Sequence, residues 1–342
     1  MNEILIIKPD DMHLHLREGK LLRAVLKDTE KQFARAVVMP NLIDPVINIQ
    51  KVENYYDEIK KISSSFEPLM TLYFTDNLTK DQIKNASEIS KIIGIKLYPS
   101  GVTTNSERGV ESISDCYHIF EAMEKFDLPL LIHGEVNDLK VDVFDREKTF
   151  IDKYLFNITK TFPNLRIVFE HISTSDAVDF VNEANDKVAA TITPHHILMN
   201  RNDLLSGGIK PHNYCLPILK REVHQKAVLN AAISGNPKFF LGTDSAPHLR
   251  NEKESSCGCA GVYSALNAIE LYAEIFEKNN ALEKLENFSS VFGADFYRLP
   301  TNKSKLRLVK KANLIPKSIK IEGGEIIPYL ADTEIQWQSF AE

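Results

Sequence analysis

Two histidines near the start of the chain, His13 and His15, are separated by a single residue. Side chains two residues apart in a β-strand project from the same face, so this spacing would point both imidazoles in one direction. Imidazole nitrogen is a frequent ligand of zinc and other transition metals. Taken alone, the pair indicates either a metal site or two histidines on a half-exposed strand.

Other side chains that can bind metals end short apolar runs further along the chain: His133, His171 and Asp244. Lys96 lies inside a fourth apolar run, where an unpaired ammonium group would be costly to bury. This lysine could form an internal ion pair or extend its amine to water. Alternatively, its neutral amine could add carbon dioxide to become a carbamate, whose anionic oxygens could bridge two metals.

These residues need elements that bring them together, and the chain has eight short apolar runs separated by segments with a helical pattern. The predicted strands are residues 4–15, 34–41, 69–75, 94–98, 129–134, 166–171, 189–193 and 239–244. Apolar strands that alternate with helices predict a parallel sheet covered on both faces. Eight repeats predict an α/β fold closed into a (β/α)8 TIM barrel, whose active site lies at the carboxyl ends of the strands.

The alternative fold is a doubly wound α/β sheet, which the absence of a glycine-rich motif after the first strand disfavours. In the barrel, four histidines, one lysine and one aspartate would gather at the catalytic end. That set favours a metal centre over unrelated structural roles. We expect a single domain over residues 1–342, with the barrel core at about 4–280 and a short C-terminal extension at about 281–342. Residues 311–330 alternate apolar and polar side chains and predict a small β-like part of that extension.

Bulk properties restrict the possible partners and surroundings. The net charge of -6 gives no electrostatic support for a nucleic-acid or membrane partner. The N-terminus lacks a secretory signal pattern, and no run approaches the ~20 apolar residues of a membrane span. With only four cysteines, a reduced, cytoplasmic setting is expected. Cys257 and Cys259 are closer together than the usual zinc-ligand spacing, so we interpret them as loop residues.

The order His-x-His, Lys, His, His, Asp on strands one, four, five, six and eight resembles the amidohydrolase superfamily. More closely, eight segments are similar to the short bacterial type of dihydroorotase: PDDMHLHLREG, VVMPNL, KLYPSGVTTNS, LLIHGEV, FEHIST, TITPHH, HNYCLPILK and GTDSAPH. The resemblance runs from about Pro9 to beyond Gly261. It implies reversible, zinc-dependent cyclisation of N-carbamoyl-L-aspartate to (S)-dihydroorotate plus water, the third step of de novo pyrimidine (UMP) biosynthesis. It also implies a homodimer.

The resemblance further implies roles for individual residues. Two Zn²⁺ would be bridged by a hydroxide and by Lys96 as N6-carboxylysine. His13, His15 and Asp244 would hold one ion, and His133 and His171 the other. Asp244 would also be the catalytic group that moves a proton.

The substrate contacts implied by the resemblance come from several loops at the same end of the barrel: His15, Arg17, Asn41, Thr103, Thr104, His133, Leu216, His248 and Ala260. The guanidinium fork of Arg17 suits a carboxylate, although a solvated surface arginine is the plain alternative. Thr103 and Thr104 would lie on a mobile lid that excludes water, where the plain alternative is an ordinary surface loop. His118, His195, His196, His212 and His224 receive no catalytic role. His195 and His196 are expected to face opposite ways on a strand.

Two other functions remain possible. A related cyclic amidase, such as a dihydropyrimidinase, hydantoinase or allantoinase, usually has a long N-terminal segment that joins the tail in a separate β-sandwich. Because the first ligand here is His13, the sequence leaves little room for such a segment. A non-catalytic barrel acting as a scaffold is the second possibility, and such relatives generally lose metal ligands that this chain retains.

Overall fold

The computed structural model describes residues 2–342, and its centre is an eight-stranded parallel sheet. In spatial order the strands are β2 (Asp10–Leu14), β3 (Arg35–Val38), β4 (Glu67–Tyr73), β5 (Ile92–Leu97), β6 (Leu130–Ile132), β7 (Ile167–Phe169), β8 (Val188–Ile192) and β9 (Phe239–Leu241). The chain leaving β9 pairs with β2, since the Asp244 N–H donates to the His13 carbonyl at 2.8 Å and the His15 N–H donates to the Ser245 carbonyl at 2.9 Å. The sheet is therefore closed, and the predicted (β/α)8 barrel is confirmed.

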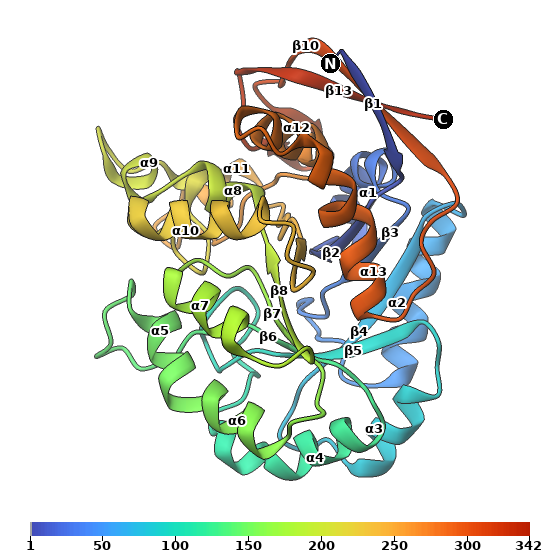
Figure 1. The fold of residues 1–342 in the computed structure, drawn as a ribbon, viewed down its shortest axis with the longest axis vertical. Coiled ribbons are helices and arrows are strands. Elements are labelled where there is room, and N and C mark those ends of the chain that lie inside the picture. The colour runs from blue at the N-terminus through green and yellow to red at the C-terminus, as the bar shows by residue number, and fades with distance from the viewer. Residues whose placement is uncertain (1) are drawn as a thin grey trace.

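Helices surround this barrel (Figure 1). The α-helices are α1 (Gly19–Gln32), α2 (Ile49–Ile62), α3 (Lys80–Ser87), α4 (Tyr117–Lys125), α5 (Arg146–Phe150), α6 (Phe156–Thr161), α7 (Ser175–Glu183), α8 (Pro194–Leu198), α9 (Arg201–Leu205), α10 (Glu222–Ala232), α11 (Arg250–Lys253), α12 (Ala268–Lys278) and α13 (Phe292–Phe296). Shorter 3-10 or π turns are η1 (Ile113–Cys116), η2 (Ile151–Leu155), η3 (Pro211–Asn213), η4 (Leu282–Lys284) and η5 (Asn287–Val291). None of the helices in residues 2–342 has the length and apolar character that crossing a membrane requires.

Helix α7 shows how the sequence specifies these outer elements. The Thr174 hydroxyl accepts the Ala177 N–H at 3.1 Å, which caps the helix N-terminus. Removing such a cap costs about 1 kcal/mol. One face of α7, formed by Ala177, Val178, Phe180 and Val181, is buried against the core, so the helix has a fixed start and a fixed face toward the barrel.

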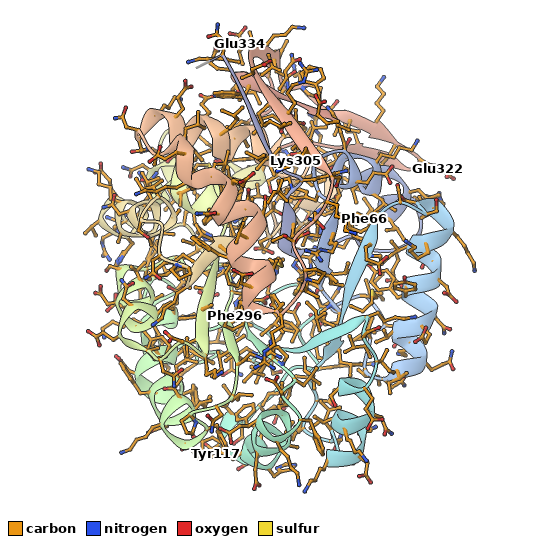
Figure 2. The ribbon with its side chains drawn as sticks, turned by 45° about the vertical axis from the view of Figure 1, so that its right-hand side comes forward. Phe66, Tyr117, Phe296, Lys305, Glu322 and Glu334 are labelled. Carbon is orange, nitrogen blue, oxygen red and sulfur yellow. The ribbon has the colours of Figure 1, made fainter. Side chains whose placement is uncertain are left out.

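The core has two layers, because alternate strand residues face opposite sides of the sheet. In β6, Leu130 and Ile132 belong to the large cluster between barrel and helices, whereas Leu131 belongs to a smaller cluster inside the barrel. Phe292 and Phe296 of α13 pack against that inner cluster, and Phe296 lies beside the barrel strands in Figure 2. Arg166, just before β7, donates to the Phe296 carbonyl at 3.0 Å, so α13 closes the amino-terminal end of the barrel.

A second, smaller sheet corrects the prediction that residues 4–15 form one strand. The chain there forms β1 (Glu3–Ile7) and then β2, with Pro9 between them. Proline lacks an N–H and fixes φ, so it interrupts the pairing. β1 pairs antiparallel with β10 (Lys305–Leu314), which pairs with β13 (Glu334–Ala341). In Figure 1 this sheet and both chain ends lie together at the top of the molecule.

The small sheet also shows that the C-terminal extension differs from the predicted one in the position of its strands. Its strands lie outside the predicted segment 311–330, except for the end of β10, and the hairpin β11 (Ile319–Ile321) and β12 (Gly324–Ile326) fills the middle of that segment. The extension also includes residues 3–7, a short strand rather than the long N-terminal segment of a separate β-sandwich for which the sequence predicted no room. Trp337 of β13 is fully buried in the same core cluster as the barrel helices, so the sheet packs on the barrel.

Candidate active site

The six predicted metal ligands lie at the carboxyl ends of the barrel strands. His13 and Lys96 are within β2 and β5, and the other four lie one to three residues past the strand ends: His15, His133, His171 and Asp244. The pairing of β2 with β3 shifts between Asp11 and Leu14. Such an irregularity can redirect side chains, and here Met12 packs inside the barrel while the two neighbouring histidines face the cavity.

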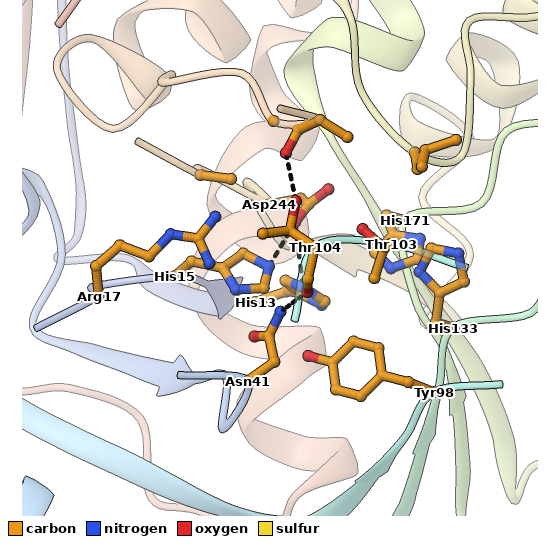
Figure 3. A pocket seen from close by; sticks show the side chains of 14 residues that line it. His13, His15, Arg17, Asn41, Tyr98, Thr103, Thr104, His133, His171 and Asp244 are labelled. Carbon is orange, nitrogen blue, oxygen red and sulfur yellow. Dashed lines mark hydrogen bonds and ion pairs between the residues drawn. The ribbon is translucent and has the colours of Figure 1, made fainter. Parts of the chain in front are cut away.

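One cavity at this end brings the predicted residues together (Figure 3). Its lining is His13, His15, Arg17, Asn41, Tyr98, Thr103, Thr104, His133, His171, Leu216, Asp244, Ala246, Ala260 and Gly261. Two predicted residues are absent from this lining. Lys96 is fully buried beneath it, and His248 lies behind Arg17.

The carboxylate of Asp244 lies between the imidazoles in Figure 3. Its Oδ1 is 3.3 Å from His13 Nε2 and 3.1 Å from His15 Nε2. On the other side, the rings of His133 and His171 have centroids 4.7 Å apart, and those of His13 and His171 are 5.0 Å apart. The four imidazoles therefore face one small volume, although they come from three separate strands.

The backbone at this site is strained. Arg17, His171 and Asp244 have positive φ values of 60°, 44° and 47°, in the left-handed region that costs non-glycine residues of order 1–3 kcal/mol each. The surrounding barrel holds these conformations. The His171 N–H donates to the Thr191 hydroxyl at 2.7 Å, for example, which fixes the turn after β7. Strain at three residues of one cavity is typical of functional sites.

Several buried polar atoms of the site form no hydrogen bond within residues 2–342. They include the Nδ1 atoms of His15 and His171. The ring nitrogens of His13 also lack hydrogen-bond geometry, although Nδ1 lies 3.0 Å from Glu170 Oε1 and Nε2 lies 3.3 Å from Asp244 Oδ1. A buried polar group without a partner is costly and calls for an explanation. The ligand atoms of His13, His15 and Asp244 lie within 4.8 Å of one another, and so do those of His13, Glu170 and His171. Converging imidazoles and carboxylates are a donor set that fits divalent cations such as zinc.

The charge states of three of the four imidazoles suit metal binding. Burial lowers the pKa of His15 to about 3 and also lowers the pKa values of His133 and His171, so these rings are neutral near pH 7 with a free lone pair. His13 differs, because the Glu170 and Asp244 carboxylates outweigh burial and raise its pKa to about 9. Burial alone would raise the pKa of Asp244, but contact with the imidazoles holds it well below its usual range. Asp244 is therefore ionised near neutral pH.

The fully buried side chain of Lys96 forms an ion pair with Glu170. Of the three interpretations of this lysine, the structure contradicts extension to water, because the side chain has no exposed surface. Its Nζ also lies 5.0 Å from the centroid of the Tyr98 ring. Burial lowers the pKa of Lys96, which favours the neutral amine, while Glu170 opposes that shift.

The structure contradicts the alternative that Arg17 is a solvated surface residue. Its side chain is 8% exposed, its Nη2 lies 3.1 Å from His248 Nε2, and its backbone carbonyl accepts the Tyr55 hydroxyl at 2.8 Å. Arg17 Nη1 and Asn41 Oδ1 line the same cavity but have no hydrogen-bond partner within residues 2–342. A buried guanidinium with a free N–H group is suited to binding an anion such as a carboxylate.

The predicted lid loop, residues 101–105, lies over the cavity. Asn41 Nδ2 donates to the Thr104 carbonyl at 2.9 Å, and the Thr104 hydroxyl donates to the Ala260 carbonyl at 3.3 Å. Asn105 Nδ2 donates back to the Asn41 carbonyl at 3.1 Å. The loop therefore connects the chain beyond β3 with the segment containing Ala260, and it is not a plain surface loop.

Three residues of the site were not predicted from the sequence. Tyr98 lines the cavity, and its hydroxyl has no hydrogen bond to any residue from 2 to 342, while Glu170 contacts two predicted ligands. Glu135 accepts the His133 Nε2–H at 2.9 Å, which leaves the Nδ1 lone pair of that ring for a metal. Its other oxygen lies 3.8 Å from Lys220 Nζ. A carboxylate two residues after a candidate ligand is a signal that could have identified Glu135.

His195 and His196 lie on a helix, so the expectation that they would face opposite ways on a strand does not apply. Both lie on α8, and their ring centroids are 4.6 Å apart. His196 Nε2 donates to the Pro217 carbonyl at 2.8 Å, and its Nδ1 accepts the Thr193 hydroxyl at 2.8 Å. These bonds explain its burial without any catalytic role.

Comparison with known proteins agrees with this architecture. The profile of the amidohydrolase family matches residues 5–340. The chain belongs to the amidohydrolase family. Within that family its full-length relatives are dihydroorotases: those of Picosynechococcus sp. and Acaryochloris marina are 55% and 53% identical over 341 residues, covering 99% of each chain.

Among solved structures, the chain is also similar to dihydroorotases. Dihydroorotase of Saccharomyces cerevisiae, in complex with 5-fluoroorotic acid, is similar at a TM-score of 0.94 and 35% identity, covering 100% of this chain and 99% of the other. Dihydroorotase of Campylobacter jejuni has a TM-score of 0.91 and 36% identity, covering 99% and 97%. An L-hydantoinase of Arthrobacter aurescens reaches a TM-score of 0.83 at only 13% identity, covering 99% and 84%, so it shares the fold alone.

Proposed function

We propose that this chain catalyses the reversible cyclisation of N-carbamoyl-L-aspartate to (S)-dihydroorotate plus water, the third step of de novo pyrimidine biosynthesis. One observation supports this above all: the chain is 53–55% identical to dihydroorotases over its full length. A scaffold without activity would not need to retain every ligand-type residue around one cavity. A hydantoinase or dihydropyrimidinase would not need the buried Arg17.

The cofactor we propose is a pair of Zn²⁺ ions. His13, His15 and Asp244 would hold one ion, His133 and His171 would hold the other, and Lys96 would be shared as N6-carboxylysine. That group forms when the neutral amine adds carbon dioxide and releases a proton, and burial of Lys96 favours the neutral amine. When bound, such a metal pair polarises an amide carbonyl and supplies hydroxide near neutral pH.

Asp244 is the proposed acid–base group. Its low pKa leaves it ionised and able to accept the proton of the carbamoyl nitrogen during cyclisation. In the reverse direction it returns a proton to the ring nitrogen as the ring opens. Contacts with His13 and His15 hold its carboxylate at a fixed position in the cavity, so the proton moves over a short, defined distance.

We propose that Arg17 determines which ring substrates bind. Dihydroorotate carries a carboxylate beside its ring nitrogen, and the free Nη1 of Arg17 with the Asn41 side chain can bind that group. His248, beside Arg17 Nη2, would complete the pocket. Ring substrates without this carboxylate would leave the buried guanidinium unpaired, which is unfavourable.

The remaining substrate contacts come from the rim of the cavity. Thr103 and Thr104, over the site, would bind carbamoyl aspartate and exclude water during the reaction. Backbone groups of Leu216 and Ala260 would bind the polar edge of the ring. By likeness to short bacterial dihydroorotases, we also propose that the chain is a single-domain homodimer in the cytoplasm.

The test is a dihydroorotate hydrolysis assay with zinc quantification on the same sample. We expect turnover of dihydroorotate, about two metals per chain, and little activity on hydantoin or dihydrouracil. A metal-loaded sample that hydrolyses those two substrates but not dihydroorotate would contradict the proposal. A dimer is checked separately by light scattering.

A further inference from the structure

A buried lysine outside the metal cluster, Lys253, ends the short helix α11 and is 4% exposed. Its ammonium group donates to three backbone carbonyls: Tyr214 at 2.8 Å, Cys259 at 2.7 Å and Gly261 at 2.7 Å. Lysine has three N–H donors, so all of them are used. Within residues 2–342, no carboxylate forms an ion pair with this group, and backbone carbonyls alone accept its hydrogen bonds.

The three carbonyls belong to two chain segments that meet at the rim of the cavity. One segment runs from Tyr214 to Leu216, and the other contains Ala260 between its two acceptors, Cys259 and Gly261. The Gly261 N–H also donates to the Tyr214 carbonyl at 2.9 Å. Lys253 therefore joins the two segments beside the proposed backbone contacts to the substrate. Both contact residues, Leu216 and Ala260, line the cavity.

The contact with Cys259 also fixes the orientation of the peptide unit between Cys259 and Ala260. The C=O and N–H of one trans peptide unit point to opposite sides. Because the Cys259 carbonyl points at Lys253, the Ala260 N–H of the same peptide unit points away from α11. The next carbonyl, that of Ala260, lies 3.0 Å from His248 Nε2 and accepts the Thr104 hydroxyl. The orientation of this peptide is thus linked to Lys253 on one side and to the residues around the substrate site on the other.

We propose that Lys253 is a positioning residue that holds the Leu216 and Ala260 backbones at the separation and orientation needed to bind the polar edge of the substrate ring. The proposal rests on the proposed function, which assigns these backbone groups to the substrate. It predicts that loss of the ammonium group weakens ground-state binding and leaves the metal ligands and Asp244 in place, because none of those residues contacts Lys253.

A matched control exists at a distance from the cavity. Lys238 also donates to backbone carbonyls, those of Val181, Asn182 and Ala184, at the C-terminal end of α7 before β9 begins. It does not line the cavity. Lys238→Met removes a comparable set of carbonyl contacts, so it reports what such a loss does to stability alone.

The experiment compares Lys253→Met and Lys238→Met with the wild type. It measures KM and kcat for dihydroorotate, metals per chain, and the Kd of 5-fluoroorotic acid, the ligand bound to the yeast relative. For Lys253→Met we expect KM and Kd to rise about tenfold or more, with kcat changed by less than about threefold and the metal content unchanged. Lys238→Met should leave all four values as they are. Unchanged KM and Kd in folded, metal-loaded Lys253→Met would overturn the proposal.

A measurement on the wild type does not depend on the variant folding. Burial lowers the pKa of Lys253 to about 8, although Cys215 and Cys259 act to raise it. The other groups facing it are neutral near that pH, since the pKa values of Tyr214, Cys215 and Cys259 are raised and those of His195 and His248 are lowered. Below about pH 8 the ammonium keeps three donors, and above it one donor is lost.

The Kd of 5-fluoroorotic acid for the wild type should therefore rise as the pH increases through about 8, and Lys253→Met should lack that rise. A Kd that stays constant across this range would overturn the proposal even if the variant does not fold. Because this readout needs no turnover, it is separate from the proposed function, which fails instead if the metal-loaded wild type does not hydrolyse dihydroorotate.

Discussion

The two ends of the barrel are built from the same eight strands, but they differ in the side chains that they gather and in the polar groups that these leave without hydrogen bonds. At the amino end, Phe292 and Phe296 of α13 pack on the inner core, and Arg166 donates both to Asp127 and to the Phe296 carbonyl. At the carboxyl end, the Nδ1 atoms of His15 and His171 are buried without a hydrogen-bond partner in residues 2–342. The amino end also has a buried hydroxyl, that of Tyr297, without a hydrogen bond within residues 2–342, so the two ends differ in kind: the carboxyl end gathers imidazole and guanidinium groups around one cavity, whereas the amino end is filled by apolar packing.

Left-handed backbone conformations occur at both ends, at Asp127 and Arg298 near the amino end and at Arg17, His171 and Asp244 at the carboxyl end. Those at the carboxyl end belong to residues that line the cavity, so the stability they cost places side chains there. The packing of α13 differs, since it adds buried apolar surface at the amino end. We infer that the amino end stabilises the barrel and that the carboxyl end uses part of that stability for binding and chemistry.

Substitution of Lys96 should have the largest effect on the functional end. Lys96→Ala removes the proposed shared ligand, so we expect no detectable hydrolysis of dihydroorotate and fewer than two metals per chain. A small added carboxylic acid should restore part of the activity, because it can occupy the place of the carbamate. Turnover at the wild-type rate without the additive would remove Lys96 from the mechanism.

Asp244→Ala should have the next largest effect. The loss of both a ligand and the proton-transfer group should lower kcat by about a thousandfold or more. The free energy of unfolding should fall, because alanine keeps the left-handed backbone and removes an ionised carboxylate that contacts His13 and His15 and whose pKa the fold lowers. A decrease in kcat of less than about tenfold would contradict the role of Asp244.

The same contrast explains what the sequence could predict. The barrel and the candidate ligands could be predicted from local patterns: apolar runs, their alternation with helices, and side chains able to bind metals in or just after several of the runs. The separation of β1 from β2 could not be predicted in this way, because the partner of β1 is β10, at the other end of the chain. Pro9 was the one local sign of the break.

Two residues near the cavity, Glu170 and Lys253, were not predicted because they act through contacts with residues from other strands or loops, which a single sequence does not show. Arg17 was ambiguous for the same reason, since its burial depends on Tyr55 and His248. Glu135 differs, since its contact with His133 is local and had a signal in the sequence. The ligand and substrate roles themselves remain predictions, although the structure places the residues close enough to perform them.

Glu135→Gln should have an intermediate effect, because it keeps the shape of the side chain but removes its charge. The His133 Nε2–H would lose a charged acceptor, and the Lys220 ammonium would lose its buried neighbour. Loss of such an outer contact typically weakens metal binding by about 10–100-fold. Titration with a zinc chelator measures this, and an unchanged affinity would show that Glu135 does not orient His133.

Phe296→Ala should have the smallest effect on catalysis, because it changes only the amino end. A buried Phe→Ala substitution costs about 3–5 kcal/mol, and since Phe296 is only partly buried, we expect about 2 kcal/mol, measured by urea denaturation. The kcat and KM of the folded variant should stay within about twofold of the wild type, because the inner core cluster lies between α13 and the cavity. A loss of activity as large as that of Glu135→Gln, without loss of stability, would mean that the two ends are coupled and that the division proposed here is wrong.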